Sequence, residues 1–117
     1  MSQEDIVIVG MARTPMGGLL GELANLSAPE LGAVAVKAAM KEANAKSADT
    51  IFMGNVLSAG LGQAPARQAA LKAGLDNGTQ AVTLNKMCGS GLQAVAMARQ
   101  ALLSGESDVV IAGGMES

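Results

Sequence analysis

Four short apolar runs alternate along this chain with segments whose apolar residues have helical spacing, and this alternation limits the fold more than any other feature. The runs are rich in Val, Ile, Leu and Met and contain or end at Gly or Asn, which is typical of strands buried on both faces of a parallel sheet. We expect strands at 5–10, 50–56, 81–85 and 108–114. The resulting βαβαβαβ order predicts an α/β fold in which right-handed crossovers place helices against the sheet.

The first helix has both a start signal and an amphipathic pattern. Ser27 and Glu30 have the spacing of a capping box, and Pro29 stands in the first turn, where its missing N–H costs nothing. We expect this helix to extend to about Asn44. The apolar residues with i, i+3, i+4, i+7 spacing, which we expect to face the core, are Leu31, Val34, Ala35 and Ala38.

A second helix is expected at 66–73, with Gly74 as its left-handed stop, and a third from the tight turn at 86–91 to about Ser104. The third helix is apolar on almost every side, which is typical of a central helix covered on both faces. Four strands and three helices do not supply that cover. We therefore expect residues 1–117 to be an incomplete folding unit whose apolar surfaces meet further polypeptide.

Composition and charge exclude several classes of protein. Hydrophobic residues make up 50% of the chain and charged residues 15%, which excludes a disordered polypeptide. The net charge of −2, without a run of Lys or Arg, predicts no nucleic-acid partner. The acidic segment 1–5 does not resemble a signal peptide, and no apolar run approaches the roughly 20 residues of a membrane span. We expect a cytoplasmic protein with no membrane partner.

Cys88 is the candidate catalytic residue. We expect it between the carboxyl end of a strand and the N-terminus of a helix, where α/β sheets place ligands and where free N–H groups stabilise an anion. Gly89, Ser90 and Gly91 lack bulk, so a substrate carbonyl can approach the sulfur while the Cys88 amide donates to the developing oxyanion. The alternative is that Cys88 is a small buried hydrophobe.

The other candidate residues have weaker signals. The Gly-Ser-Gly turn at 89–91 also fits a phosphate cradle, although one G-x-G is not a dinucleotide motif. Lys86 stands close enough in sequence to bias the thiol electrostatically. Arg13 is more typical of a structural ion pair or loop anchor than of a catalytic group, and Glu116 of a loop hydrogen-bond acceptor. Because the chain contains no His and one Cys, imidazole chemistry, a disulfide or a thiolate metal site would need residues from elsewhere.

A series of motifs resembles the N-terminal part of the thiolase family. The resemblance covers the whole chain, and the order and spacing of the motifs are more specific than any one of them. Cys-Gly-Ser-Gly is more similar to the acetyl-CoA acetyltransferases than to the longer-chain 3-ketoacyl thiolases. The motifs are Ala-Arg-Thr-Pro at 12–15, Gly-Asn-Val at 54–56, Gly-Leu-Gly-Gln at 60–63, Pro-Ala-Arg-Gln-Ala-Ala at 65–70, Asn-Lys-Met-Cys-Gly-Ser-Gly-Leu at 85–92 and Ala-Gly-Gly-Met-Glu-Ser at 112–117.

The resemblance implies a two-step acyl transfer. Cys88 aligns with the family's nucleophile, which would take an acetyl group from acetyl-CoA as a thioester; a second acetyl-CoA would then attack it to give acetoacetyl-CoA, or the reverse. Coenzyme A thioesters would be substrates, with no permanently bound cofactor and no metal. The implied fold is a duplicated α/β/α layered one, of which 1–117 would be most of the first half. A homodimer or homotetramer is implied, with the strand at 83–85 near the dimer contact.

The resemblance also implies groups that this sequence lacks. The family uses a histidine that activates the nucleophile, an asparagine and a histidine at the thioester oxygen, and a second cysteine, all in its C-terminal half; the loop domain that holds coenzyme A also lies beyond Ser117. We expect a companion chain or a continuation to supply them. Two alternatives stay open: an inactive truncated fragment, and a related condensing ketosynthase that uses a carrier protein.

Overall fold

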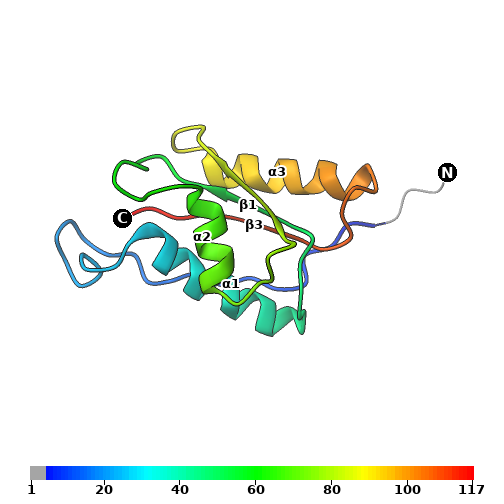
Figure 1. Cartoon of the computed structure of the whole chain (residues 1–117), viewed down its shortest axis with the longest axis horizontal. Helices are drawn as coiled ribbons and strands as arrows, with labels where there is room; N and C mark the ends of the chain where they lie inside the picture. The colour runs from blue at the N-terminus through cyan, green and yellow to red at the C-terminus, as the bar shows by residue number, and fades with distance from the viewer. Residues whose placement is uncertain (1–4) are drawn as a thin grey trace.

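The structure is a computed structural model that describes residues 5–117, so the acidic N-terminal segment lies outside the described residues except for Asp5. Three parallel strands form a sheet between two layers of helices (Figure 1). The α/β class and the layered arrangement expected from the sequence are confirmed. The elements are α1 Ala28–Ala43, β1 Thr50–Gly54, α2 Pro65–Lys72, β2 Gln80–Leu84, α3 Ser90–Leu103 and β3 Val110–Gly114.

The sheet has the order β2-β1-β3, and β1 pairs in parallel with both neighbours. Ile51 of β1, for example, lies opposite Ala81 of β2 and Ile111 of β3. All five residues of β1 are buried, as expected for a central strand with helices on both faces. Because the strands are parallel, their carboxyl ends meet at one edge of the sheet.

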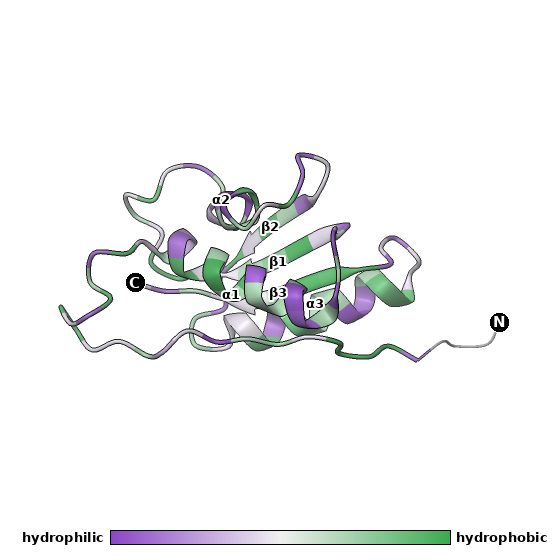
Figure 2. Cartoon of the chain, turned by 90° about the horizontal axis from the view of Figure 1, so that it is seen from below, coloured by the Kyte–Doolittle hydropathy of each residue, from purple (hydrophilic) through white to green (hydrophobic). Residues whose placement is uncertain are grey.

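Alternate side chains of β1 define the two halves of the core. Ile51 and Met53 pack into the cluster formed with α1 and α2, whereas Phe52 packs on the opposite face against the Ala-rich side of α3. Small residues dominate both clusters, so the helices approach the sheet closely. In Figure 2 the hydrophobic colour is concentrated in the strands between the helices.

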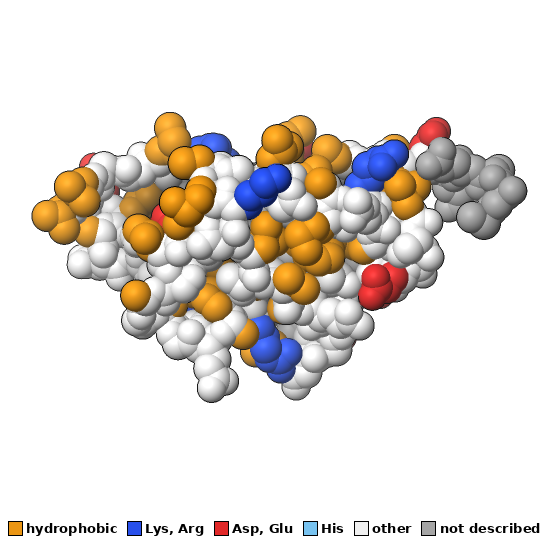
Figure 3. Space-filling view, turned by 90° about the horizontal axis from the view of Figure 1, so that it is seen from above, with side chains coloured by type: hydrophobic (Ala, Val, Ile, Leu, Met, Phe, Trp, Pro, Cys, Tyr) orange, Lys and Arg blue, Asp and Glu red, His pale blue; other side chains and the backbone are white. Residues whose placement is uncertain are grey.

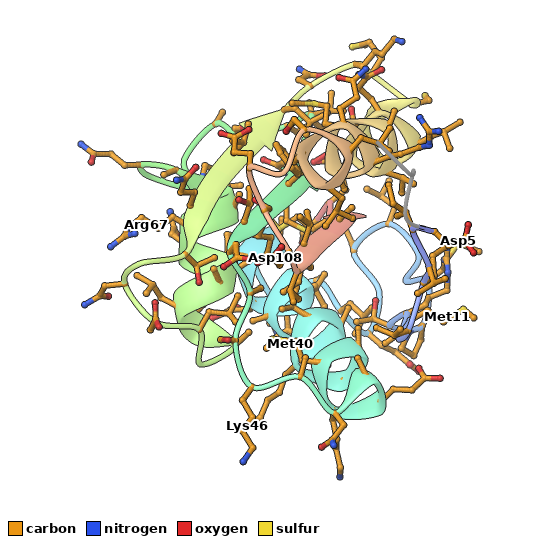
Figure 4. The ribbon with its side chains drawn as sticks, turned by 90° about the vertical axis from the view of Figure 1, so that its right-hand side faces the viewer. Asp5, Met11, Met40, Lys46, Arg67 and Asp108 are labelled. Atoms are coloured by element: carbon orange, nitrogen blue, oxygen red, sulfur yellow. The ribbon has the colours of Figure 1, made fainter. Side chains whose placement is uncertain are left out.

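The expected strand at 5–10 is not part of the sheet, and this expectation is wrong. The segment runs beside α1: Gly10 lies against the backbone oxygen of Ala39, and the Met11 amide donates to Oε2 of Glu42 at 3.0 Å. The apolar side chains of the segment are exposed, Ile8 at 79%. Figure 4 shows Met11 on the opposite side of the molecule from Arg67 of α2. The pattern was that of a two-sided strand, but among residues 5–117 no strand pairs with it.

The start of α1 agrees with the sequence, whereas the predicted buried stripe does not. Ser27 Oγ accepts from the Glu30 amide, and Glu30 Oε2 accepts from the Ser27 amide at 2.8 Å, so the capping box is confirmed. Val34 is 61% exposed and Ala38 is also exposed. The buried residues lie on a neighbouring stripe of the helix, where Gly32 brings α1 close to Met115 and Ala69. The residues that α1 buries are Ala28, Pro29, Gly32, Ala33 and Val36.

The third helix is covered on one face only in the described part of the chain. Ala94, Ala98 and Ala101 are buried against the sheet, whereas Leu92 is 77% exposed and Val95 46%. One apolar face of α3 is therefore left uncovered by residues 5–117, in agreement with the expectation that the strands and helices of this chain do not cover the helix on both faces. Figure 3 looks onto this side of the molecule and shows hydrophobic side chains gathered in the middle of the face. No helix in the described residues is both long and apolar enough to span a membrane.

Candidate active site

Cys88 lies in the loop that joins the edge strand β2 to α3, at the carboxyl edge of the sheet (Figure 1, the yellow-green loop). Gly89 is the N-cap of α3, and it makes no side-chain cap hydrogen bond. The thiol is free and exposed. The structure places Cys88 between the end of a strand and the start of a helix, as expected, and its side chain is not buried by residues 5–117.

The backbone of the Cys88 loop has an uncommon conformation. Met87 is left-handed, with φ 49°, although it is not glycine. Its amide donates to Oδ1 of Asn85 at 2.9 Å, and the Gly89 amide donates to the Lys86 carbonyl at 3.0 Å. Left-handed backbone is disfavoured for residues that carry a Cβ and is concentrated at functional sites. The loop therefore holds Cys88 in a defined, strained turn.

An open cavity of about 1110 Å³ extends from Cys88 across the carboxyl edge of the sheet. The loop at 12–20 forms one wall, the residues after β1 another, and the N-terminal turn of α3 a third. Gly54 and Gly91 line it where β1 and α3 touch. This is the edge at which parallel α/β sheets bind ligands, and the space is large enough for a sizeable substrate or an inserted polypeptide segment.

The structure brings Arg13 and Glu116 to the same cavity as Cys88. Lys86 is directed elsewhere: its Nζ donates to Oε1 of Gln93, a residue of α3, at 3.2 Å. The Gly-Ser-Gly turn is occupied by internal bonds, because the Ser90 hydroxyl contacts Lys86 and Met87. Residues 5–117 contain no group of three or more His, Cys, Asp or Glu side chains able to hold a metal ion.

Glu116 is a loop hydrogen-bond acceptor, as the sequence predicted. Its carboxylate accepts from the amides of Val56 at 3.1 Å and Leu57 at 3.0 Å. It also accepts from the side chain of Asn55, which is 2% exposed. Sequence reasoning gave Asn55 no role of its own. The available signal was a polar residue directly after the apolar run 51–54, at the edge where a site was expected.

Known proteins that are similar in sequence or structure show which family has this arrangement of sheet and cysteine loop. Residues 6–117 match the model of the thiolase N-terminal domain. The chain is 55% identical to acetyl-CoA acetyltransferase 2 of Arabidopsis thaliana, over 100% of this chain and 30% of that protein. It is 52% identical to the acetyl-CoA acetyltransferase of Cupriavidus necator, over 97% of this chain and 29% of that protein.

A solved structure agrees with these sequence relatives. The Acat5 thiolase from Ascaris suum, crystallised in complex with coenzyme A, superposes with a TM-score of 0.92 at 38% identity, over 95% of this chain and 30% of that one. The chain belongs to the thiolase family. It corresponds to the N-terminal domain and spans about 30% of the length of the relatives it matches.

Proposed function

We propose that this chain supplies the nucleophile half of an acetyl-CoA C-acetyltransferase active site, with the Cys88 thiolate as the group that takes the acetyl. The observation that carries the proposal is an exposed thiol at the N-terminus of α3, on the wall of a large cavity, in a chain of the thiolase family. Attack by sulfur on the thioester carbonyl expels the coenzyme A thiolate and leaves acetyl-Cys88. A second acetyl-CoA, deprotonated at its methyl carbon, then attacks this carbonyl and releases Cys88 and acetoacetyl-CoA.

Two features support a site that is completed by other polypeptide. The sequence has no histidine and no second cysteine, which are the residue types that the family resemblance implies as the bases for the thiol and for the acetyl methyl. The outer face of α3 and the segment from Ile6 to Val9 expose apolar side chains. Both surfaces fit further protein better than water. We propose that a companion chain or continuation contributes the remaining catalytic groups and covers these faces.

The acetyl-enzyme can be tested directly because Cys88 is the one cysteine of the chain. The chain is produced together with the C-terminal part of the Cupriavidus necator relative, exposed to acetyl-CoA, and weighed intact. We expect the mass of one acetyl group on this chain, located at Cys88 by peptide mapping. The Cys88→Ala variant gains no acetyl group, and its complex loses thiolysis of acetoacetyl-CoA. Turnover of the variant complex equal to that of the unsubstituted one would refute the proposal.

The same experiment separates the alternatives. An inactive fragment forms no acetyl-Cys88 even when a folded complex is recovered. A condensing ketosynthase that uses a carrier protein would be active with thioesters of acyl carrier protein but not with those of coenzyme A. The relatives named above are acetyl-CoA acetyltransferases, and this favours coenzyme A as the carrier. The mass of the complex, measured by native mass spectrometry, also tests whether it is the proposed dimer or tetramer.

A further inference from the structure

We propose that Ser90 is a positioning residue for Cys88: its buried hydroxyl fixes the turn that presents the thiol to the cavity. The inference rests on the proposed function, in which Cys88 is the nucleophile, and extends it to a residue that acts by holding the Cys88 loop. Ser90 lies two positions after Cys88, as the first residue of α3, and is 5% exposed.

The hydroxyl of Ser90 bonds to the backbone of the Cys88 loop on both sides of the Lys86–Met87 peptide unit. Its Oγ accepts from the Lys86 amide at 2.8 Å and donates to the Met87 carbonyl at 2.6 Å. One side chain therefore satisfies a donor and an acceptor of the two residues that precede Cys88. Backbone turns at Gly89 and Ser90 close the other side of the loop. Cys88 stands between these fixed points, with its side chain exposed.

These bonds act on the residue whose backbone is strained. Met87 has φ 49°, and for a residue with a Cβ this conformation is disfavoured relative to the right-handed region. Asn85 Oδ1 holds the Met87 amide and Ser90 Oγ holds its carbonyl, so the Met87 backbone is fixed by a side chain at each end. Without the Ser90 hydroxyl, the turn keeps the backbone bonds from the Ser90 amide to the Met87 carbonyl and from the Gly89 amide to the Lys86 carbonyl. It loses both side-chain bonds of Ser90, and Cys88 is held less tightly.

Ser90 is itself fixed against the sheet. A Cβ placed on Gly54 would lie 2.5 Å from the Cβ of Ser90 and 2.9 Å from its carbonyl carbon. The backbone of the central strand β1 therefore packs directly against Ser90, and this contact fixes the distance of the hydroxyl from the sheet. Through this contact, β1 sets the position of the Cys88 loop.

The rate at which iodoacetamide alkylates Cys88 at fixed pH measures the loop without acetyl-CoA. We expect Ser90→Ala to slow alkylation about two- to fivefold, because a displaced thiolate loses its interaction with the N-terminus of α3. This is the usual size of one such interaction between a negative charge and a helix N-terminus. The matched control is Ser104→Ala. Ser104 Oγ also donates to the carbonyl three residues earlier, that of Ala101, and accepts from a backbone amide, but at the other end of α3. Its loss leaves the rate unchanged.

A double-mutant cycle separates positioning from a general loss of structure. Asn adopts left-handed backbone more readily than Met. If Ser90 acts by holding Met87, then Ser90→Ala slows alkylation less in a Met87→Asn background than in the wild-type chain. An equal loss in both backgrounds, or a folded Ser90→Ala variant that reacts at the wild-type rate, overturns the proposal.

Hydrogen exchange decides the question if Ser90→Ala does not fold. Among residues 5–117, the Lys86 amide, on an exposed loop residue, has Ser90 Oγ as its one hydrogen-bond acceptor. Slow exchange there supports the proposal, and exchange at the rate of a free amide overturns it. Neither measurement uses acetyl-CoA, so failure of this inference is distinct from failure of Cys88 to be acetylated.

Discussion

Asn55 and Glu116 meet at the carboxyl edge of the sheet, although 61 positions separate them: Nδ2 of Asn55 donates to Oε1 of Glu116 at 2.9 Å. The same Nδ2 donates to the Met115 carbonyl at 3.1 Å, and Oδ1 of Asn55 accepts from the Ser58 hydroxyl at 2.8 Å. One buried amide thus joins the segment after β1 to the segment after β3. These two segments are neighbouring walls of the cavity that contains Cys88.

Asn55→Ala should lower the free energy of unfolding by about 2–3 kcal/mol, because it removes the side-chain donor to the buried Met115 carbonyl and one of the three donors to the Glu116 carboxylate. Urea unfolding followed by circular dichroism measures the change. Asn25→Ala is the control, since Asn25 lies on an exposed loop, and its loss should change stability by less than about 0.5 kcal/mol. Equal effects at the two sites would contradict the bridging role of Asn55.

Gly54→Ala and Gly91→Ala should have opposite effects on stability. A Cβ at Gly54 would meet the Ser90 backbone and Cβ, whereas one at Gly91 meets nothing within 4 Å. We expect Gly54→Ala to destabilise the chain by about 1–3 kcal/mol through overpacking. Gly91→Ala should stabilise it by up to about 1 kcal/mol, because alanine favours the helix. Thermal unfolding of both variants tests the contact; stabilisation by Gly54→Ala would show that β1 and α3 are not in close contact.

Asp49 should contribute a component of stability that disappears in acid. The amides of Val109 and Asp108 donate to its carboxylate and hold the pKa of Asp49 below its ordinary value. Since the folded pKa is lower than the unfolded one, this stability is present above the unfolded pKa. It is lost as the pH falls through the folded pKa, below about pH 4.

Urea midpoints of the wild-type chain and Asp49→Asn, measured between neutral pH and the acid limit of folding, test this component. The difference between the two chains should shrink as the pH falls. Asp108→Asn is the control, because it removes a neighbouring carboxylate but keeps the backbone amide that binds Asp49. A constant difference across the pH range would contradict the assignment.

Leu92 and Ala94 should respond differently to the same polar substitution. Leu92 is 77% exposed, so Leu92→Gln should change the free energy of unfolding by no more than about 0.5 kcal/mol. Ala94 is fully buried against the sheet, so Ala94→Gln should cost about 2 kcal/mol or more. Under the proposed function, Leu92→Gln weakens binding to the completing polypeptide, which titration of the two chains measures. Unchanged binding would show that the outer face of α3 is not part of the interface.

The sequence predicted the elements that carry local signals. The capping box at Ser27 placed the start of α1, and Gly74 follows α2 with φ 94°, as a left-handed stop should. The strands at 50–56, 81–85 and 108–114 were each found within a few residues of their observed bounds. The strand predicted at 5–10 was not found. The hydropathy of this segment indicates that it requires a buried environment, and residues 5–117 do not bury it. The exposed side of α3, by contrast, agrees with the expectation that this chain does not cover the helix on both faces.

The candidate site was predictable in position but not in construction. Cys88 could be placed because a strand followed by a small-residue turn and a helix locates the carboxyl edge of a parallel sheet. No pattern indicated that Met87 would be left-handed, since Met has no preference for that conformation. The bonds of Asn55 to Glu116 depend on which strand ends become neighbours, and this follows from the β2-β1-β3 order rather than from local sequence.

The contact of Gly54 with the N-terminal turn of α3 is continued by β3, because a Cβ on Gly114 would lie 3.6 Å from the Cα of Gly91. Where these three glycines line the cavity, its wall is main chain. Main chain has no χ angles, so a ligand that settles on this wall immobilises no rotamers there. The wall also cannot widen by a rotamer change. Its shape alters only if a strand shifts, and the dimensions that a substrate meets beside Cys88 are therefore those of the sheet itself.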